Sequence, residues 1–196
     1  MKYIATGCAA FALFACFDLA ALKRIPYLKQ LSWLAGNLLF GYCLLVVIRH
    51  GARLPVPVWV IYAGWVTLVP SILLLIYSLF LEIPFRQTYA SQGTGNALVK
   101  RGTYALVRHP GVLWFGLLLL SLLMVSPSRL LLVAAPVWLL MDVLYAWVQD
   151  RFFFEKMLPG YEAYRDETPM FIPTAQSIRR CWRSMGKRTI SECRSE

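Results

Sequence analysis

Hydrophobic residues occur along this chain in five long blocks, and short polar segments separate the blocks. A helix needs about 20 mostly apolar residues to cross the hydrocarbon core of a bilayer. The strands of a membrane barrel would alternate apolar and polar residues, which these blocks do not. We therefore predict an all-α, polytopic membrane protein with about five transmembrane helices. The blocks are residues 4–22, 31–48, 58–81 (interrupted by Pro70), 112–125 and 130–148.

The last two blocks predict a helical hairpin over residues 112–148. A four-residue turn at 126–129 separates them. Pro127 in this turn ends the first helix, and Ser128 is suited to cap the second. The block 112–125 is short for a full span, so it either extends toward the N-terminus or enters the membrane only partway.

The first block has a second interpretation, because residues 1–20 also resemble a signal peptide and residues 13–16 faintly resemble a lipoprotein cleavage box. Asp18 and Lys23 follow the apolar run without a clean site of small residues. Since the later blocks already commit the chain to the membrane, we favour a first transmembrane helix.

The composition fits a membrane protein better than a protein that binds nucleic acid. Hydrophobic residues make up 59% of the chain and charged residues 15%, against about 25% charged in ordinary soluble proteins. The net charge of +10 would attract nucleic acid, but no nucleic-acid motif accompanies it. Lys and Arg concentrate in cytoplasmic loops of membrane proteins, where anionic lipid attracts them. We expect the lipid bilayer as a partner and no nucleic acid.

The distribution of positive charge predicts the orientation. Sixteen of the 20 Lys and Arg residues follow the first, third and fifth blocks, and the other four lie on the opposite side. Without the basic C-terminal region, seven Lys and Arg residues lie on the first side and four on the opposite side, so the bias keeps its direction. The bias predicts a multi-pass protein with its N-terminus outside and its C-terminus in the cytoplasm.

Two polar segments on that predicted cytoplasmic side carry the candidate chemistry. In the first, residues 98–110, Arg108 and His109 precede Pro110 at the expected start of the fourth helix. A guanidinium, an imidazole and the free amides of a helix N-terminus together favour a carboxylate or phosphate. The alternative is a basic pair that only touches lipid headgroups.

The second segment, residues 150–173, continues the fifth helix into water. Arg151 and Glu155 are four residues apart and share a helix face, so they could project toward the same cleft and grip a zwitterionic ligand. The alternative is a local surface salt bridge. Tyr161 and Tyr164 could form an aromatic wall, or they could pack a short amphipathic segment against the membrane surface.

Together, these residues resemble the isoprenylcysteine carboxyl methyltransferase family, which belongs with the membrane phospholipid methyltransferases. The resemblance covers residues 98–173 and is compatible with the third helix; the first 80 or so residues and the tail lie outside it. The matching motifs are Gly102-x-Tyr104-x-x-x-Arg108-His109-Pro110, the hairpin, Glu155-x-x-Leu158, Gly160-Tyr161-x-x-Tyr164 and Ile172-Pro173.

The resemblance implies S-adenosylmethionine as methyl donor, bound by the loop before the fourth helix and by the segment after the last span. Tyr104, Arg108 and His109 would contact it, with His109 near its carboxylate, and Tyr161 and Tyr164 would form part of the pocket wall. Arg151 and Glu155 would be the catalytic pair: Glu155 would face the amino group of the donor, and Arg151 would position donor or acceptor.

The chain departs from the family pattern at three places. Gly111 and Val112 follow the Arg-His-Pro triplet where members commonly have an aromatic residue. Residues 152–154 are all phenylalanine where many members are acidic, and the linker between Leu158 and Tyr161 is short. The acceptor is therefore open beyond a lipidic or small hydrophobic molecule.

Two other function classes compete with this interpretation. A membrane reductase of the steroid-reductase type resembles these methyltransferases in its C-terminal helices but uses NADPH. A non-enzymatic scaffold or transporter subunit is the third. The domain organisation expected for a methyltransferase is three N-terminal helices at 1–81, a core at 82–173 and a basic, disordered tail at 174–196 that is dispensable for catalysis. The oligomeric state stays open.

Polar residues within the spans form a further candidate set. Asp142, Tyr145 and Gln149 share a helix face and could line a tunnel for the acceptor, because intramembrane acids are expensive and tend to be functional. The alternative is an interhelical hydrogen bond from Asp142 to Asn37 or Thr67.

The remaining reactive groups predict neither a metal site nor a disulfide. Glu82, at the end of the third block, either joins the pocket or marks the membrane interface. The cysteines form no CxxC pair, so we expect reduced, unpaired thiols. They are Cys8, Cys16, Cys43, Cys181 and Cys193.

Overall fold

The computed structural model describes residues 1–25, 27–83 and 98–185. This part of the chain is helical and forms no strand beyond one isolated bridge between Arg53 and Ser128, which confirms the predicted all-α class. In chain order the elements are α1 (Lys2–Lys23), α2 (Leu28–His50), α3 (Val58–Ile76), the π-helix η1 (Tyr77–Glu82), α4 (Thr103–Leu106), α5 (Pro110–Val125), α6 (Arg129–Val148), the π-helix η3 (Gln149–Phe153), α7 (Phe154–Met157), α8 (Tyr161–Glu167) and α9 (Ala175–Met185).

Within the described residues, four helical stretches are long and apolar enough to cross a membrane, and they overlap four of the predicted blocks. They are Lys2–Lys23, Leu28–His50, Val58–Glu82 and Arg129–Met157. The expected interruption at Pro70 does not occur, because α3 continues through this residue and changes to π-helical geometry only at Tyr77.

The fifth apolar helix, α5, is shorter than a full span. Its 16 residues begin at Pro110, and at 1.5 Å per residue they measure about 24 Å, against about 30 Å of hydrocarbon. The helix therefore extends the predicted block 112–125 by only two residues toward the N-terminus. The helix packs along α3 and α6.

The predicted hairpin between α5 and α6 is confirmed. The Ser128 hydroxyl accepts a hydrogen bond from the Leu131 amide at 3.4 Å, which caps α6, and donates to the Val47 carbonyl at 3.0 Å. The second bond joins the turn to the end of α2. The hairpin therefore returns the chain to the end of the bundle from which α5 starts.

The core lies between α1, α2, α5 and α6 around the fully buried Trp138. The indole N–H donates to the Ile4 carbonyl at 3.1 Å. Gly7 allows this approach, since a Cβ atom there would lie 2.6 Å from the indole nitrogen. This contact joins α1 and α6 along the cavity described below.

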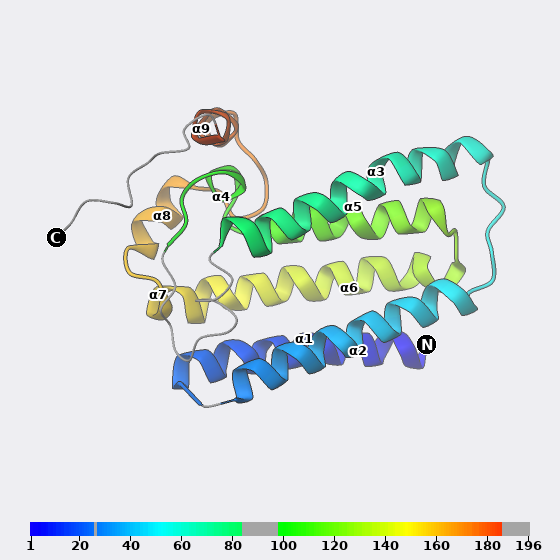
Figure 1. The fold of residues 1–196 in the computed structure, drawn as a ribbon, viewed down its shortest axis with the longest axis horizontal. Coiled ribbons are helices and arrows are strands. Elements are labelled where there is room, and N and C mark those ends of the chain that lie inside the picture. The colour runs from blue at the N-terminus through cyan, green and yellow to red at the C-terminus, as the bar shows by residue number, and fades with distance from the viewer. Residues whose placement is uncertain (26, 84–97, 186–196) are drawn as a thin grey trace.

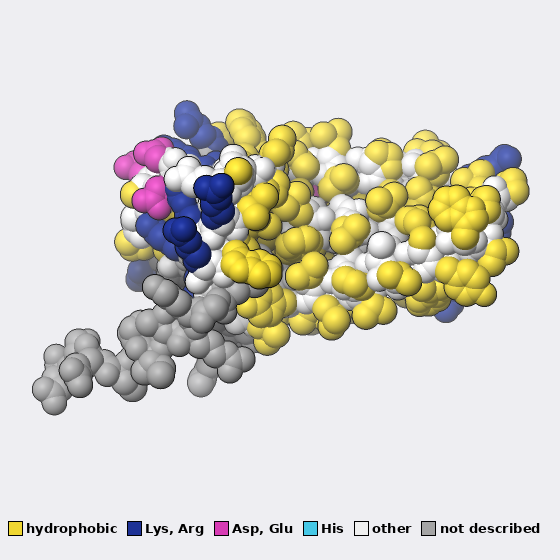
Figure 2. All heavy atoms as spheres, turned by 90° about the horizontal axis from the view of Figure 1, so that it is seen from above, with side chains coloured by type: hydrophobic (Ala, Val, Ile, Leu, Met, Phe, Trp, Pro, Cys, Tyr) yellow, Lys and Arg dark blue, Asp and Glu magenta, His cyan; other side chains and the backbone are white. Residues whose placement is uncertain are grey.

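The spans lie side by side, and α4, α7, α8 and α9 gather beyond one end of them (Figure 1). We call this the polar end; the N-terminus lies at the opposite end. Hydrophobic side chains cover the length of the molecule between charged side chains at its two ends (Figure 2). Many are well exposed, such as Leu38 at 65% and Val66 at 73%, as expected of side chains that face lipid. The two candidate segments therefore meet at one end.

The predicted disorder of the tail is wrong for residues 175–185, which form α9. The Thr174 hydroxyl accepts from the Ser177 amide at 3.2 Å, and the Ser177 hydroxyl accepts from the Thr174 amide at 2.9 Å. This reciprocal pair caps the start of the helix in the manner of a capping box. Residues 186–196 lie outside the described part of the chain.

Candidate functional site

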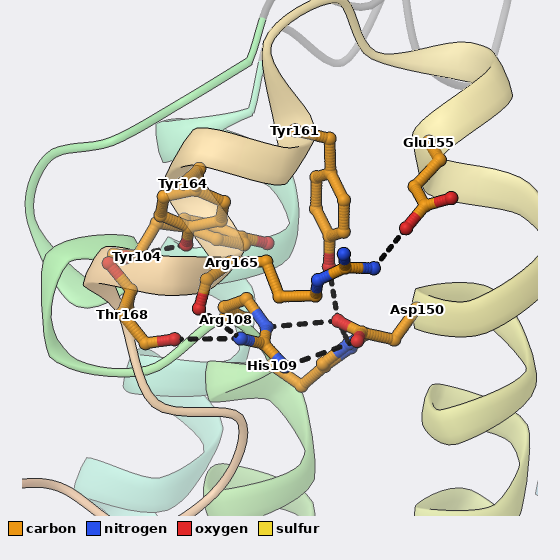
Figure 3. A network of polar contacts seen from close by, with 9 residues as sticks. All are labelled: Tyr104, Arg108, His109, Asp150, Glu155, Tyr161, Tyr164, Arg165 and Thr168. Carbon is orange, nitrogen blue, oxygen red and sulfur yellow. Dashed lines mark hydrogen bonds and ion pairs between the residues drawn. The ribbon is translucent and has the colours of Figure 1, made fainter.

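The Asp150 carboxylate is the centre of the polar network at the polar end (Figure 3). Its Oδ1 atom accepts from the Arg108 Nε at 3.0 Å, and its Oδ2 atom accepts from Arg108 Nη2 at 3.1 Å. The His109 Nε2 atom lies 3.3 Å from Oδ1, and the Tyr161 hydroxyl donates to the same oxygen. One carboxylate in η3, directly after α6, therefore ties together the start of α5 and the start of α8.

Backbone pairing fixes the segment before α5. The Arg108 amide donates to the Pro169 carbonyl at 2.9 Å, and the His109 amide donates to the Met170 carbonyl at 3.3 Å. The Arg108 Nη1 atom donates to the carbonyls of Arg165 at 2.7 Å and of Thr168 at 2.9 Å, where the C-terminus of a helix favours a cation.

Arg108 lines the cavity, but most of its hydrogen-bonding capacity is already used. A guanidinium has five N–H groups, and the contacts to Asp150 and to the two carbonyls at the end of α8 occupy four of them. Its first role is therefore to hold α8 against α6, and one N–H remains for a ligand.

His109 is buried and stacked on an aromatic ring. The Phe154 ring lies parallel to the imidazole, with centroids 5.5 Å apart and 12° between the planes. Burial lowers the pKa of His109 from 6.5, against the opposing effect of its hydrogen bond to Asp150. Because Asp150 is an acceptor, we assign the neutral tautomer with the proton on Nε2, which leaves Nδ1 as an acceptor.

Tyr161 and Tyr164, the two tyrosines predicted to form an aromatic wall, line the cavity together with Tyr104. The Tyr164 hydroxyl donates to the Tyr104 carbonyl at 2.6 Å, and the Tyr104 hydroxyl donates to the Ser78 carbonyl at 3.2 Å. The rings of Tyr161 and Tyr164 meet edge to face at 5.8 Å. Burial raises the pKa values of Tyr161 and Tyr164 well above 10, so both act as neutral donors.

Glu82 caps α4 instead of lining the cavity. Its carboxylate accepts from the Thr103 amide at 2.9 and 3.1 Å and from the Thr103 hydroxyl. Gly102, directly before Thr103, has a φ of +58°, and a Cβ atom at this position would lie 1.5 Å from a Glu82 oxygen. The Gly102 amide donates to the Ser184 hydroxyl at 2.9 Å, so α9 contacts the start of α4, which carries Tyr104.

A cavity of about 540 Å³ connects this network to the interior of the bundle. Its volume lies within the usual range for small-molecule sites, about 300–1,000 Å³. At the polar end its lining includes Tyr104, Arg108, His109, Tyr161 and Tyr164. Between the spans its lining includes Phe11, Phe14, Phe40, Leu44, Phe115 and Leu118. One continuous space therefore has a polar end and an apolar end.

Arg151 and Glu155 do not reach this cavity. Neither belongs to its lining, and Arg151 is exposed. Glu155 pairs with Arg165 on α8 instead of with Arg151. The expected projection of both side chains toward the cleft is therefore not found. The sequence pattern placed them on one helix face, but η3 changes the geometry directly after α6.

A second polar group lies in the cavity wall, on α1, α6 and η3. The Tyr145 hydroxyl donates to Asp18 at 2.6 Å, and Gln149 Nε2 donates to the same oxygen at 2.9 Å. Buried Lys29 also belongs to the lining. This cluster agrees with the prediction of a polar lining on the Tyr145–Gln149 face.

Asp142 lines the same cavity but makes none of its predicted bonds. Asn37 donates to the Trp33 carbonyl, and Thr67 bonds with Ser121 and its own helix. Within residues 1–25, 27–83 and 98–185, no hydrogen-bond partner reaches the Asp142 carboxylate. The alternative of an interhelical bond is therefore wrong.

Sequence reasoning missed Asp150 and Lys29 as site residues. Asp150 follows the last span directly, at the same predicted end as the basic Arg108–His109 pair, and this opposite charge was the available signal. Lys29 was expected in a loop between two spans. In the structure it lies in the apolar helix α2 and is buried.

No set of three or more His, Cys, Asp or Glu side chains within the described residues could hold a metal ion. Comparison of the chain with protein-family models, curated proteins and solved structures finds no match.

Proposed function

We propose that this protein is an integral membrane methyltransferase that moves a methyl group from S-adenosylmethionine to a lipidic or small hydrophobic acceptor. The observation that carries the proposal is the single cavity with a polar, aromatic end and an apolar end between the spans. Two substrates of opposite polarity need such a space if they are to meet. The motif resemblance and the cavity support the same function independently.

The polar end suits the donor, which carries a sulfonium cation, an amino group and a carboxylate. The rings of Tyr104, Tyr161, Tyr164 and Phe154 line this end, and aromatic faces attract cations, more strongly where water is excluded. The N-terminus of α5, at Pro110, opens on the same wall and favours an anion. The fifth N–H of the Arg108 guanidinium is a further donor for a carboxylate.

The apolar end suits the acceptor. Phenylalanines from α1, α2 and α5 line it, and Asp142 is the carboxylate within it that has no hydrogen-bond partner in the described chain. A buried polar group without a partner is costly, so a hydrogen-bond donor on the acceptor would offset that cost. The bilayer would supply such a molecule sideways between the spans.

The bound donor supplies an activated methyl group, and the residues of this chain contribute position more than proton transfer. The network around Asp150 holds α5, α6 and α8 in one arrangement, which orients the two ends of the cavity. Holding two reactants in line can supply several kcal/mol of the acceleration. A carboxylate or thiolate acceptor needs no base, whereas an amine or phenol does.

The charge of the cavity favours this donor over NADPH. The cationic side chains in the described lining are Lys29, Arg108 and, when protonated, His109. Arg108 is largely engaged by Asp150, and burial keeps His109 neutral at pH 7. A pyrophosphate with a further phosphate needs several charged donors. The predicted orientation, with the polar end in the cytoplasm, would give a water-soluble donor direct access.

Ligand-dependent thermal stabilisation in detergent tests the proposal. S-adenosylhomocysteine should raise the unfolding midpoint of the wild-type protein, since a ligand that binds only the folded state stabilises it. NADPH should not. His109→Ala should abolish the shift. The reverse pattern, in which NADPH raises the unfolding midpoint and S-adenosylhomocysteine does not, would support a reductase and contradict the proposed methyltransferase.

Glu155→Ala separates the motif resemblance from the geometry. The resemblance assigns Glu155 to the amino group of the donor, so it predicts weaker binding. The structure has Glu155 outside the cavity and paired with Arg165, so it predicts unchanged binding. Titration of the wild type and of Glu155→Ala with S-adenosylhomocysteine decides between these two expectations.

A further inference from the structure

Helix α9 runs across the direction of the spans and lies beside the polar end of the bundle, where Figure 1 shows it end-on. A helix in this orientation lies in the plane of the membrane if the bundle crosses it. It lies at the same end of the bundle as α4 and α8, and it packs on α4. It is therefore placed at the level expected for lipid headgroups.

One face of α9 packs on the protein. Ser177 and Cys181, one turn apart, are buried against α4. The Ser184 hydroxyl accepts from the Gly102 amide at 2.9 Å, and Arg180 Nη1 donates to the Glu167 carbonyl at 2.8 Å. These contacts fix the rotation of the helix, so its other side chains have a defined direction.

The remaining surface of α9 divides into an apolar stripe and a basic stripe. Ile178 and Trp182, four residues apart, are 52% and 78% exposed. Arg179 and Arg183, each one residue further on, are also exposed. A helix with Trp and an aliphatic side chain on one stripe and Arg on the next is typical of helices that lie in the membrane interface.

We infer that α9 is a membrane-surface helix that binds anionic lipid headgroups and thereby holds α4, which carries Tyr104. Ile178 and Trp182 would enter the acyl boundary, and Arg179 and Arg183 would contact lipid phosphates. Charge complementarity selects this occupant, because two arginines beside an apolar stripe match an anionic headgroup above hydrocarbon. Since Ser184 bonds to Gly102, a docked α9 also restrains α4.

Hydrogen–deuterium exchange in nanodiscs tests this inference. The wild-type protein is compared in discs of phosphatidylcholine alone and of phosphatidylcholine with 30% phosphatidylglycerol, at one salt concentration. Each basic residue near an anionic surface contributes about 1 kcal/mol. Two arginines should therefore raise the protection of amides 178–185 by about 30-fold in the anionic disc, which is about 2 kcal/mol, and the amides of α4 should follow in the same direction.

The paired variant Arg179→Gln with Arg183→Gln should lose this difference between the discs. The matched control is Lys23→Gln with Arg24→Gln, which removes two exposed positive charges from the same end of the bundle but far from α9 along the chain; it should keep the difference. Trp182→Ala should lower protection in both discs, because the apolar stripe acts on either lipid.

Equal protection of α9 in the two discs, or equal loss in the paired variant and its control, would overturn the inference. So would protection that rises with protein concentration in detergent without lipid, because that result would identify a second copy of the chain as the occupant. The readout does not depend on methyl transfer, so either result leaves the proposed activity to be judged by its own assay.

Discussion

Asp150→Asn is the most informative perturbation of the polar end, because one carboxylate holds three elements together. The substitution keeps the shape of the side chain and removes its charge. Arg108 and Asp150 are nearly buried, with 10% and 11% of their side chains exposed. The variant therefore leaves a guanidinium in a buried position without its counter-charge, and neutral oxygens (the Asn side-chain oxygen and two backbone carbonyls) are its remaining acceptors.

The expected loss of stability follows from this burial. Removing one partner of a buried ion pair costs about 3–5 kcal/mol. The carbonyls of Arg165 and Thr168 still accept from Arg108, so we take the lower end, about 3 kcal/mol. For a chain of this length that corresponds to a fall of roughly 6–12 °C in the unfolding midpoint, measured by thermal unfolding in detergent without ligand.

Glu155→Gln is the matched control. It also removes one carboxylate from an ion pair with arginine at the polar end, but this pair is about one-third exposed. Solvent screens such a pair, so the midpoint should hardly change. A midpoint of Asp150→Asn that stays within the shift of the control would refute the view that Asp150 organises the site.

Four further predictions concern single features of the fold. Gly160→Ala, at φ of +79° in open space, should cost only the roughly 1–2 kcal/mol of left-handed backbone strain. Gly102→Ala should cost more, because its ψ of −131° lies outside the left-handed helical region and its Cβ would meet Glu82; equal thermal shifts of the two variants would contradict this. The lowered pKa of His109 means that the unfolded state, with a pKa near 6.5, binds a proton first as the pH falls; stability should therefore decline below about pH 6.5, and less so in His109→Gln, whereas identical pH profiles of the two proteins would argue against a neutral buried imidazole. Asp142→Leu should raise the unfolding midpoint by removing a carboxylate without a described partner, while Met141→Leu should leave it unchanged; a destabilised Asp142→Leu would show that the carboxylate is satisfied. Truncation after Met185 should leave amide exchange in α4 unchanged, but truncation after Pro173 should increase it, because this truncation removes the Ser184 bond to Gly102; unchanged exchange after the longer truncation would show that α9 does not restrain α4.

The hydrophobic blocks predicted the helices well because a bilayer imposes one length and one secondary structure on every span. The turn at Ser128 was equally readable, since a serine between two blocks has a local role as a cap. The short helix α9 was not predicted, because the basic composition of the tail was taken to indicate disorder. The Thr174–Ser177 capping pair was visible in the sequence, with Thr174 four residues before Ile178, the first exposed apolar side chain of the stripe.

The candidate site was predicted in part. The Arg108–His109 pair and the tyrosines were found because they occupy one contiguous motif with a clear chemical character. Asp150 was missed because its role depends on which segments meet in space: residue 108 approaches it only after the hairpin closes, and residue 161 only after the chain turns between α7 and α8. Arg151 and Glu155 were predicted as a cavity pair from regular helical spacing, which the π-helical geometry of η3 does not keep.

The most direct test of the proposed methyltransferase is transfer of an isotope-labelled methyl group from S-adenosylmethionine in native membranes that contain the protein. A methyltransferase of this design predicts labelled product in the organic extract, identified by mass, at a rate that falls sharply in His109→Ala. Label in the extract at equal levels for both proteins, or none from the folded wild type with a full lipid extract present, would contradict the assignment.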